Sequence, residues 1–161
     1  MTNAPATTRL CGSLIVGAFA GPTLPSNYAQ ALAEGRRGGA ILFRQNMPEL
    51  GQLHALCRAV VEAAAPTGEP AWLGVDEEGG RVRRLPAPAL ALPPARLLGG
   101  PGAEPLAERA GDALGAQLAA LGFNVDFAPV LDVDTNPSNP VIGARAFAAE
   151  PEAVTRLAGA L

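Results

Sequence analysis

The stretch that decides the fold runs from an apolar segment into a charged loop: Ala71-Trp72-Leu73-Gly74-Val75-Asp76-Glu77-Glu78-Gly79-Gly80-Arg81-Val82-Arg83-Arg84. The apolar run is short and nearly continuous, which is typical of a strand that is covered on both faces. In parallel α/β folds, ligand sites lie in the loops that follow the carboxyl ends of the strands. The segment that begins at Asp76 is therefore the first candidate site.

Strand-like and helix-like segments alternate on both sides of this stretch. We expect strands at residues 10–18, 40–43, 71–75 and 123–130. We expect helices at residues 26–36, 48–64, 104–121 and from 151 onward. The order β-α-β-α-β-α-β-α predicts an α/β fold with a parallel sheet and right-handed crossovers. The long loops, about 77–102 and 131–149, follow the third and fourth strands, so both belong to the face that carries the site.

The composition excludes several kinds of chemistry. The chain has 161 residues, with 12 basic side chains against 15 acidic ones and a formal net charge of −3. All the basic residues are arginine, and His54 is the single histidine. A Schiff-base lysine, a Walker-type phosphate lysine and a histidine pair are therefore excluded. The acidic balance argues against nucleic acid as a partner, and no apolar run approaches the roughly 18 residues of a membrane helix.

The two cysteines bear on the compartment. Cys11 and Cys57 lie in apolar segments rather than in a spaced framework, which is typical of free thiols in a reducing environment. Residues 9–20 loosely imitate a signal peptide, but their apolar run is short and interrupted, and a buried strand explains it as well. We expect a cytoplasmic protein, with secretion as the open alternative.

Two patterns imitate metal sites without completing them. Asp132, Asp134 and Asn136 resemble the opening of a calcium loop, but Pro137 stands where that loop needs glycine. His54 lies three residues from a cysteine on a predicted helix, and no second pair exists to complete a zinc site. We expect no metal and no cofactor, with the loop carboxylates pinning the backbone instead.

The charged stretch 76–84 has two interpretations. In one, a carboxylate accepts hydrogen bonds from ligand hydroxyls beside a guanidinium that donates them, an arrangement suited to a sugar. In the other, the arginines only neutralise the carboxylates within a salt-bridged loop. The position at the end of a strand favours a site.

Four segments in this order resemble the N-terminal barrel of glycoside hydrolase family 3, and within it the bacterial β-N-acetylhexosaminidases that release N-acetylglucosamine from peptidoglycan fragments. They are residues 38–46, 73–84, 121–134 and 141–147. Each segment alone is a weak signal, whereas four in order cover nearly the whole chain.

This resemblance implies a (β/α)8 barrel of the TIM type and a retaining mechanism. Since such a barrel needs about 250 residues, we expect residues 1–161 to be part of one such domain, about its first four β/α units. By motif position, Asp76, Arg84 and Arg145 would contact the carbohydrate substrate, with Asp76 accepting hydrogen bonds from hydroxyls.

The chain also departs from the pattern of the family. The lysine-histidine motif, the acid/base histidine and the aspartate nucleophile have no counterpart, so no catalytic residue is assigned, and Ala146 replaces the usual serine. We expect an O-glycosyl hydrolase by family that is inactive as this chain. A catalytic pair drawn from Asp76, Glu77 and Asp126 is a weaker alternative.

Two other hypotheses stay open. The first is a non-catalytic sugar-binding or assembly module that completes a barrel with another chain or a second copy, with self-association through exposed half-barrel edges. The second is an unrelated small α/β enzyme that binds phosphate, which the lack of lysine and of a glycine-rich phosphate loop disfavours.

Overall fold

The computed structural model describes residues 6–161, which form two compact units. The sheet unit contains the described residues up to Val75, together with Arg84–Pro88 and Leu118–Asp126. The loop unit contains Asp76–Arg83, Ala89–Gln117 and Phe127–Leu161.

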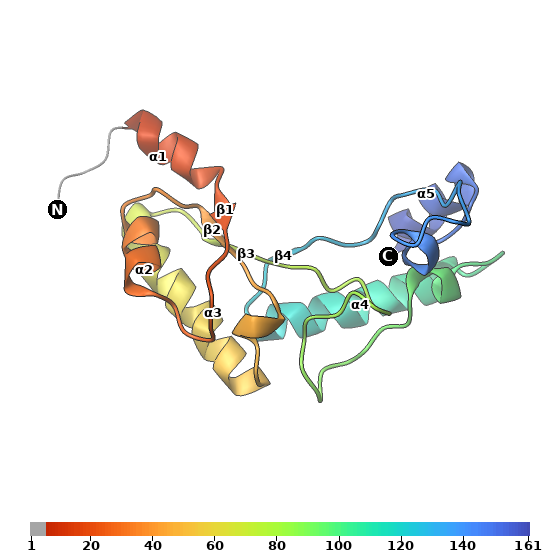
Figure 1. The fold of residues 1–161 in the computed structure, drawn as a ribbon, viewed down its shortest axis with the longest axis horizontal. Helices are drawn as coiled ribbons and strands as arrows, with labels where there is room; N and C mark the ends of the chain where they lie inside the picture. The colour runs from red at the N-terminus through yellow and green to blue at the C-terminus, as the bar shows by residue number, and fades with distance from the viewer. Residues whose placement is uncertain (1–5) are drawn as a thin grey trace. The chain divides into compact units, whose positions relative to one another are not determined.

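The sheet unit is built on four parallel strands that follow one another in chain order. They are β1 (Val16–Gly17), β2 (Gly39–Ile41), β3 (Trp72–Val75) and β4 (Val125–Asp126), labelled in Figure 1. Each connection therefore moves the chain to the neighbouring position in the sheet, as in parallel α/β folds. The predicted α/β class with a parallel sheet is confirmed.

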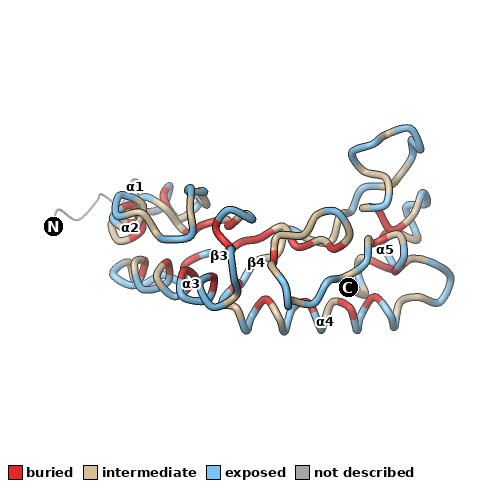
Figure 2. The backbone as a smooth tube through the Cα atoms, turned by 60° about the horizontal axis from the view of Figure 1, so that its bottom comes forward, coloured by how far each residue is buried: buried red, intermediate tan, exposed pale blue. Residues whose placement is uncertain are grey.

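Two helices of this unit pack side by side, α2 (Ser26–Ala33) and α3 (Leu50–Ala64). The buried residues of α3 recur at helical spacing, and they appear as red turns between pale blue ones in Figure 2. They are Leu53, Leu56, Cys57, Val60 and Ala64. Val61, which neighbours this buried face, is half exposed.

Strands β2 and β3 approach each other very closely. A Cβ added to Gly39 would lie 2.0 Å from the carbonyl oxygen of Trp72, so only glycine fits this position. The Tyr28 hydroxyl donates a 2.8 Å hydrogen bond to the carbonyl of Gly39 from the neighbouring helix. Trp72 itself is about half exposed.

The prediction of a strand over residues 10–18 is wrong. Helix α1 spans Ala6–Ser13, and only Val16–Gly17 pair as a strand. Tertiary contacts favour the helix, because the Arg9 guanidinium donates to the carbonyl of Thr67 at 2.7 Å. A Cβ on Gly12 would also lie 1.9 Å from the carbonyl oxygen of Gly35, so the helix sits directly against that turn. A short apolar run carries too little periodicity to reveal this.

The fourth strand is shorter than the predicted residues 123–130. Directly before β4, the Asn124 side chain forms hydrogen bonds with backbone groups at the start of β3. Its Oδ1 accepts from the amide of Leu73, and its Nδ2 donates to the carbonyl of Ala71, both at 2.8 Å. After β4, Pro129 has no amide hydrogen for a ladder.

The loop unit has a small apolar core between helix α4 (Glu104–Leu121), whose last four residues belong to the sheet unit, and helix α5 (Pro151–Ala160). Two short 3-10 helices interrupt its long loops, η3 (Ala95–Leu98) and η4 (Gly143–Arg145). The buried cluster consists of Ala95, Leu98, Ala110, Phe147, Val154 and Leu157. Among residues 6–161, no helix is both long and apolar enough to span a membrane.

Candidate functional site

The charged stretch after β3 makes a tight turn in the loop unit. Gly79 and Gly80 have positive φ values of 86° and 55°, which side chains other than glycine rarely adopt. A Cβ on Gly79 would also lie 2.5 Å from the carbonyl oxygen of Pro93. The amide of Glu78 donates to the carbonyl of Val82 at 3.0 Å and closes the turn. The glycines thus fix where the Glu78 side chain leaves the backbone.

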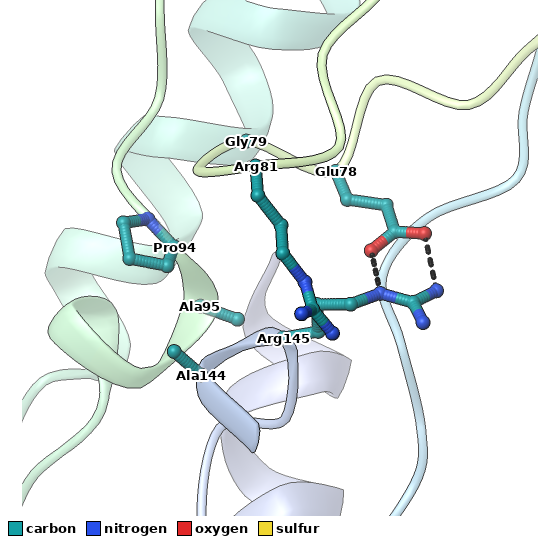
Figure 3. Close-up of a pocket in the computed structure, with 7 residues that line it drawn as sticks. All are labelled: Glu78, Gly79, Arg81, Pro94, Ala95, Ala144 and Arg145. Carbon is teal, nitrogen blue, oxygen red and sulfur yellow. Dashed lines mark hydrogen bonds and ion pairs between the residues drawn. The ribbon is translucent and has the colours of Figure 1, made fainter. Parts of the chain in front are cut away.

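Glu78 forms a two-point ion pair with Arg145, which lies 67 positions further along the chain. Nε of Arg145 donates to Oε2 at 2.7 Å, and Nη2 donates to Oε1 at 2.7 Å. Figure 3 shows the carboxylate and the guanidinium edge to edge, joined by these two bonds. The two side chains are 10% and 24% exposed, so solvent screens the pair only partly. Nη1 also donates to the carbonyl of Val141 at 3.2 Å.

Three carboxylates act on the Arg145 guanidinium. The hydrogen bonds from Glu78 are the main cause that raises its pKa above the ordinary arginine value, and burial opposes them. The charges of Glu78, Asp132 and Asp76 raise the pKa further. The sequence-predicted residues Asp76 and Arg145 therefore interact electrostatically, and Asp132 and Glu78 belong to the same group.

Arg84, the third residue expected to contact substrate, belongs to the sheet unit. Its guanidinium carbon lies 5.9 Å from the centroid of the Phe43 ring, within the range of a cation–π contact. The side chain is only partly exposed.

Glu77 follows the salt-bridged interpretation of the charged stretch. Its side chain is 2% exposed, and Oε1 lies 3.8 Å from Nε of Arg83. This pairing stays within the stretch itself. Glu78, in contrast, pairs with an arginine outside the stretch.

Two arginines without a predicted role bind segments on both sides of Arg145. Arg81 donates to the carbonyls of Pro140, at 2.7 Å, and of Val141. Arg96 donates to the Asp134 carboxylate at 2.7 Å and to the carbonyl of Ala146 at 3.1 Å. Arg81 belongs to an arginine-rich stretch, but that pattern does not identify distant carbonyls as partners, and Arg96 stands alone in the sequence.

A cavity of about 170 Å³ lies beside the ion pair in the loop unit (Figure 3). Charged groups stand at one side of it and small apolar side chains at the other. Its lining consists of Glu78, Gly79, Arg81, Pro94, Ala95, Ala144 and Arg145.

Two of the three residues that imitate a calcium loop have structural partners. The Asp134 carboxylate binds Arg96, and Oδ1 of Asn136 accepts a 3.0 Å hydrogen bond from the amide of Ser138. His54 is exposed on α3. Within the described part of the chain, no three side chains of histidine, cysteine, aspartate or glutamate gather into a group that could hold a metal ion.

A family model described as the glycosyl hydrolase family 3 N terminal domain matches residues 15–161. The chain belongs to this family. The assignment made from the four sequence segments is thereby confirmed. A β-hexosaminidase of Pseudomonas aeruginosa is 39% identical over 150 residues, which cover 92% of this chain and 43% of the relative. The chain thus spans less than half the length of this curated family 3 relative.

Solved structures of family 3 enzymes share the fold. NagZ from Neisseria gonorrhoeae, in complex with N-trifluoroacetyl-D-glucosamine, has a TM-score of 0.83 and 35% identity, over 91% of this chain and 44% of NagZ. A family 3 β-N-acetylglucosaminidase from a Paenibacillus species has a TM-score of 0.90 and 35% identity, over 98% of this chain and 30% of that enzyme.

Proposed function

We propose that this chain supplies part of the sugar site of a retaining β-N-acetylhexosaminidase that releases terminal N-acetylglucosamine from peptidoglycan-type fragments. The observation that carries the proposal is the charged group formed by Asp76 and Arg145, with a bidentate ion pair fixing the arginine. The similarity to NagZ, whose structure contains an N-acylated glucosamine derivative, supports the same ligand class.

Each predicted side chain has a role that suits its chemistry. The Asp76 carboxylate accepts hydrogen bonds from sugar hydroxyls, and the Arg145 guanidinium donates to the sugar with the N–H groups that its protein partners leave over. For Arg84, the proposal of a substrate contact rests on the resemblance to the family alone. Charge-assisted hydrogen bonds of this kind are roughly twice as strong as neutral ones, so they orient the sugar ring.

The catalytic residues that the resemblance to the family implies have no counterpart in residues 1–161. The chain has no lysine, and its single histidine, His54, is exposed on a helix of the sheet unit. A retaining glycosidase needs a nucleophile and a separate proton donor on either side of the scissile bond. We therefore propose that the barrel and its catalytic residues are completed by further polypeptide, in a cytoplasmic protein.

A direct binding experiment tests this function. Isothermal titration calorimetry with N-acetylglucosamine is expected to detect binding to residues 1–161 and to lose it in Asp76→Ala and Arg145→Ala. Asp112→Ala, an exposed carboxylate on α4, is the matched control and keeps the wild-type affinity. Circular dichroism checks that each variant is folded. Equal affinity in the wild type and in Asp76→Ala contradicts the role of Asp76.

A second candidate function is a sugar-binding module that assembles with another chain or a second copy. The absence of lysine and the exposed position of His54 favour it over catalysis by these residues alone. Incubation with an aryl N-acetyl-β-glucosaminide is expected to give no hydrolysis. Turnover at the rate of a complete hexosaminidase contradicts both this candidate and the need for further polypeptide. Sedimentation velocity tests self-association, and a strictly monomeric protein contradicts assembly with a second copy.

A further inference from the structure

The ion pair of Glu78 is both bidentate and buried, unlike an ordinary ion pair on a surface loop. Its carboxylate meets the Nε edge of Arg145 with both oxygens at 2.7 Å, and its side chain is nine-tenths buried. The carboxylate leaves a turn whose two glycines have positive φ. The turn therefore sets where the Glu78 side chain leaves the backbone, and the two bonds to Arg145 orient its carboxylate.

The contacts of Arg145 determine what it has left for a ligand. A guanidinium carries five N–H donors. Glu78 accepts from Nε and Nη2, and the carbonyl of Val141 accepts from Nη1. Among the residues that the structure describes, none accepts from the other two N–H groups, one on each terminal nitrogen, so these remain for a ligand.

The charge of Arg145 is also compensated. Glu78 supplies one negative charge in direct contact, and Asp132 and Asp76 add to the negative potential at the guanidinium. An anion that accepts hydrogen bonds from Arg145 is therefore also repelled by these negative charges. A neutral hydroxyl or amide oxygen accepts from the same donors without the repulsion, which in a partly buried site is only weakly screened.

We propose that Glu78 is a positioning and selectivity residue, which holds the Arg145 guanidinium and cancels its charge so that the site takes a neutral sugar and rejects an anionic one. This inference rests on the proposed function, since it concerns the same sugar site. It specifies the substrate as an uncharged sugar ring, with a uronate as the excluded competitor. Selectivity of this kind comes from a repulsive element against the wrong ligand.

The test compares two probes, N-acetylglucosamine and glucuronate, titrated into wild-type residues 1–161 and into Glu78→Gln. Glutamine keeps the size of the side chain and removes its charge. We expect the affinity for N-acetylglucosamine to fall about 10-fold, equivalent to about 1.4 kcal/mol, because the bidentate pair is lost. We expect the ratio of glucuronate affinity to N-acetylglucosamine affinity to rise at least about 10-fold, since an unpaired guanidinium binds carboxylates well.

Two controls separate this role from a structural one. Glu104→Gln makes the same charge change in the loop unit at the exposed ion pair with Arg156, and it must leave the ratio unchanged. In the double variant Glu78→Gln/Arg145→Met, the gain in glucuronate affinity must disappear, because it depends on the freed guanidinium. A ratio that does not change in Glu78→Gln, or a gain that persists without Arg145, overturns the proposal.

The two proposals fail in different ways. If wild-type protein binds no N-acetylglucosamine, the proposed function fails, while a gain of glucuronate binding in Glu78→Gln still supports charge compensation. If Glu78→Gln does not fold, NMR of the wild-type Arg145 side chain replaces it. The Hε resonance must then stay fixed when N-acetylglucosamine is added while the Nη protons shift. An Hε resonance that shifts with them overturns the positioning role.

Discussion

The interactions that stabilise the sheet unit differ from those that stabilise the loop unit. The sheet unit is stabilised by backbone pairing between parallel strands and by burial of an apolar helix face. The side chain of its buried Asn46 forms hydrogen bonds with backbone groups. In the loop unit, arginine side chains reach carbonyls and carboxylates far along the chain, as Arg81, Arg96 and Arg145 show. The long loops have no strand ladder, and guanidinium groups join distant segments of these loops through hydrogen bonds and ion pairs.

This difference determines which substitutions should destabilise each unit. A backbone ladder satisfies its own donors and acceptors, whereas a buried carboxylate depends on one particular partner. The loop unit should therefore be sensitive to single arginine substitutions, and the sheet unit to substitutions that disturb the close approach of its strands.

The largest expected effect is in the sheet unit, from Gly39→Ala. The added methyl group would lie 2.0 Å from a backbone oxygen of β3, so the two strands must separate. We expect a loss of more than about 4 kcal/mol in the free energy of unfolding, measured by urea denaturation with hydrogen exchange at β2 and β3. Gly51→Ala in α3 is the control, because it meets open space and should stabilise by up to about 1 kcal/mol. Similar stabilities for the two variants contradict the role of the close approach.

An intermediate effect is expected in the loop unit, from Arg96→Ala. Removal of this side chain leaves the Asp134 carboxylate, which is 11% exposed, without its ion-pair partner. We expect a loss of about 2 kcal/mol and faster proteolysis between residues 134 and 146. Arg156→Ala removes a more exposed pair and should cause no measurable change. The double variant Arg96→Ala/Asp134→Ala should recover part of the loss, and a further loss instead contradicts the ion-pair explanation.

The smallest effect is expected from high pH, and it concerns the sheet unit. Burial raises the pKa of the Cys57 thiol from 9.0 to about 12. Below pH 9 the thiol is neutral in both states. Between pH 9 and 12 only the unfolded state loses this proton, so stability falls as the pH rises. Burial also raises the pKa of Tyr28, and this acts in the same direction at higher pH.

The measurement compares urea unfolding by circular dichroism at pH 8 and pH 10. At pH 10 the wild type should lose about 1 kcal/mol more than Cys57→Ala, in which the thiol is absent. Cys11→Ala, which removes an exposed thiol, should behave like the wild type. An equal loss in wild type and Cys57→Ala contradicts the assignment of this titration to Cys57.

Most of the architecture could be predicted from local patterns, and the exceptions have clear reasons. Helix α4 spans the residues that periodicity predicted, and β3 differs by one residue. The first predicted strand failed because α1 is selected by contacts with Thr67 and Gly35, which no local pattern contains. The fourth strand was overestimated because an asparagine side chain occupies ladder positions before it, and Pro129 has no amide hydrogen for a ladder after it.

Local patterns in the sequence could likewise predict only part of the candidate site. The region Asp76–Arg84 was recognisable from its charges and its position after a strand. The partnership of Glu78 with Arg145 was not, because the sequence alone does not reveal which of several carboxylates a distant arginine meets. The role of Arg96 was missed for the same reason.

The close contact of Tyr28 with Gly39 and the exposed position of Trp72 have a practical consequence for spectroscopy. These are the single tyrosine and the single tryptophan of the chain, and both belong to the sheet unit. Tyrosine and tryptophan emission therefore originates in the sheet unit. A tryptophan introduced at the exposed Leu97 would give the loop unit an optical signal of its own.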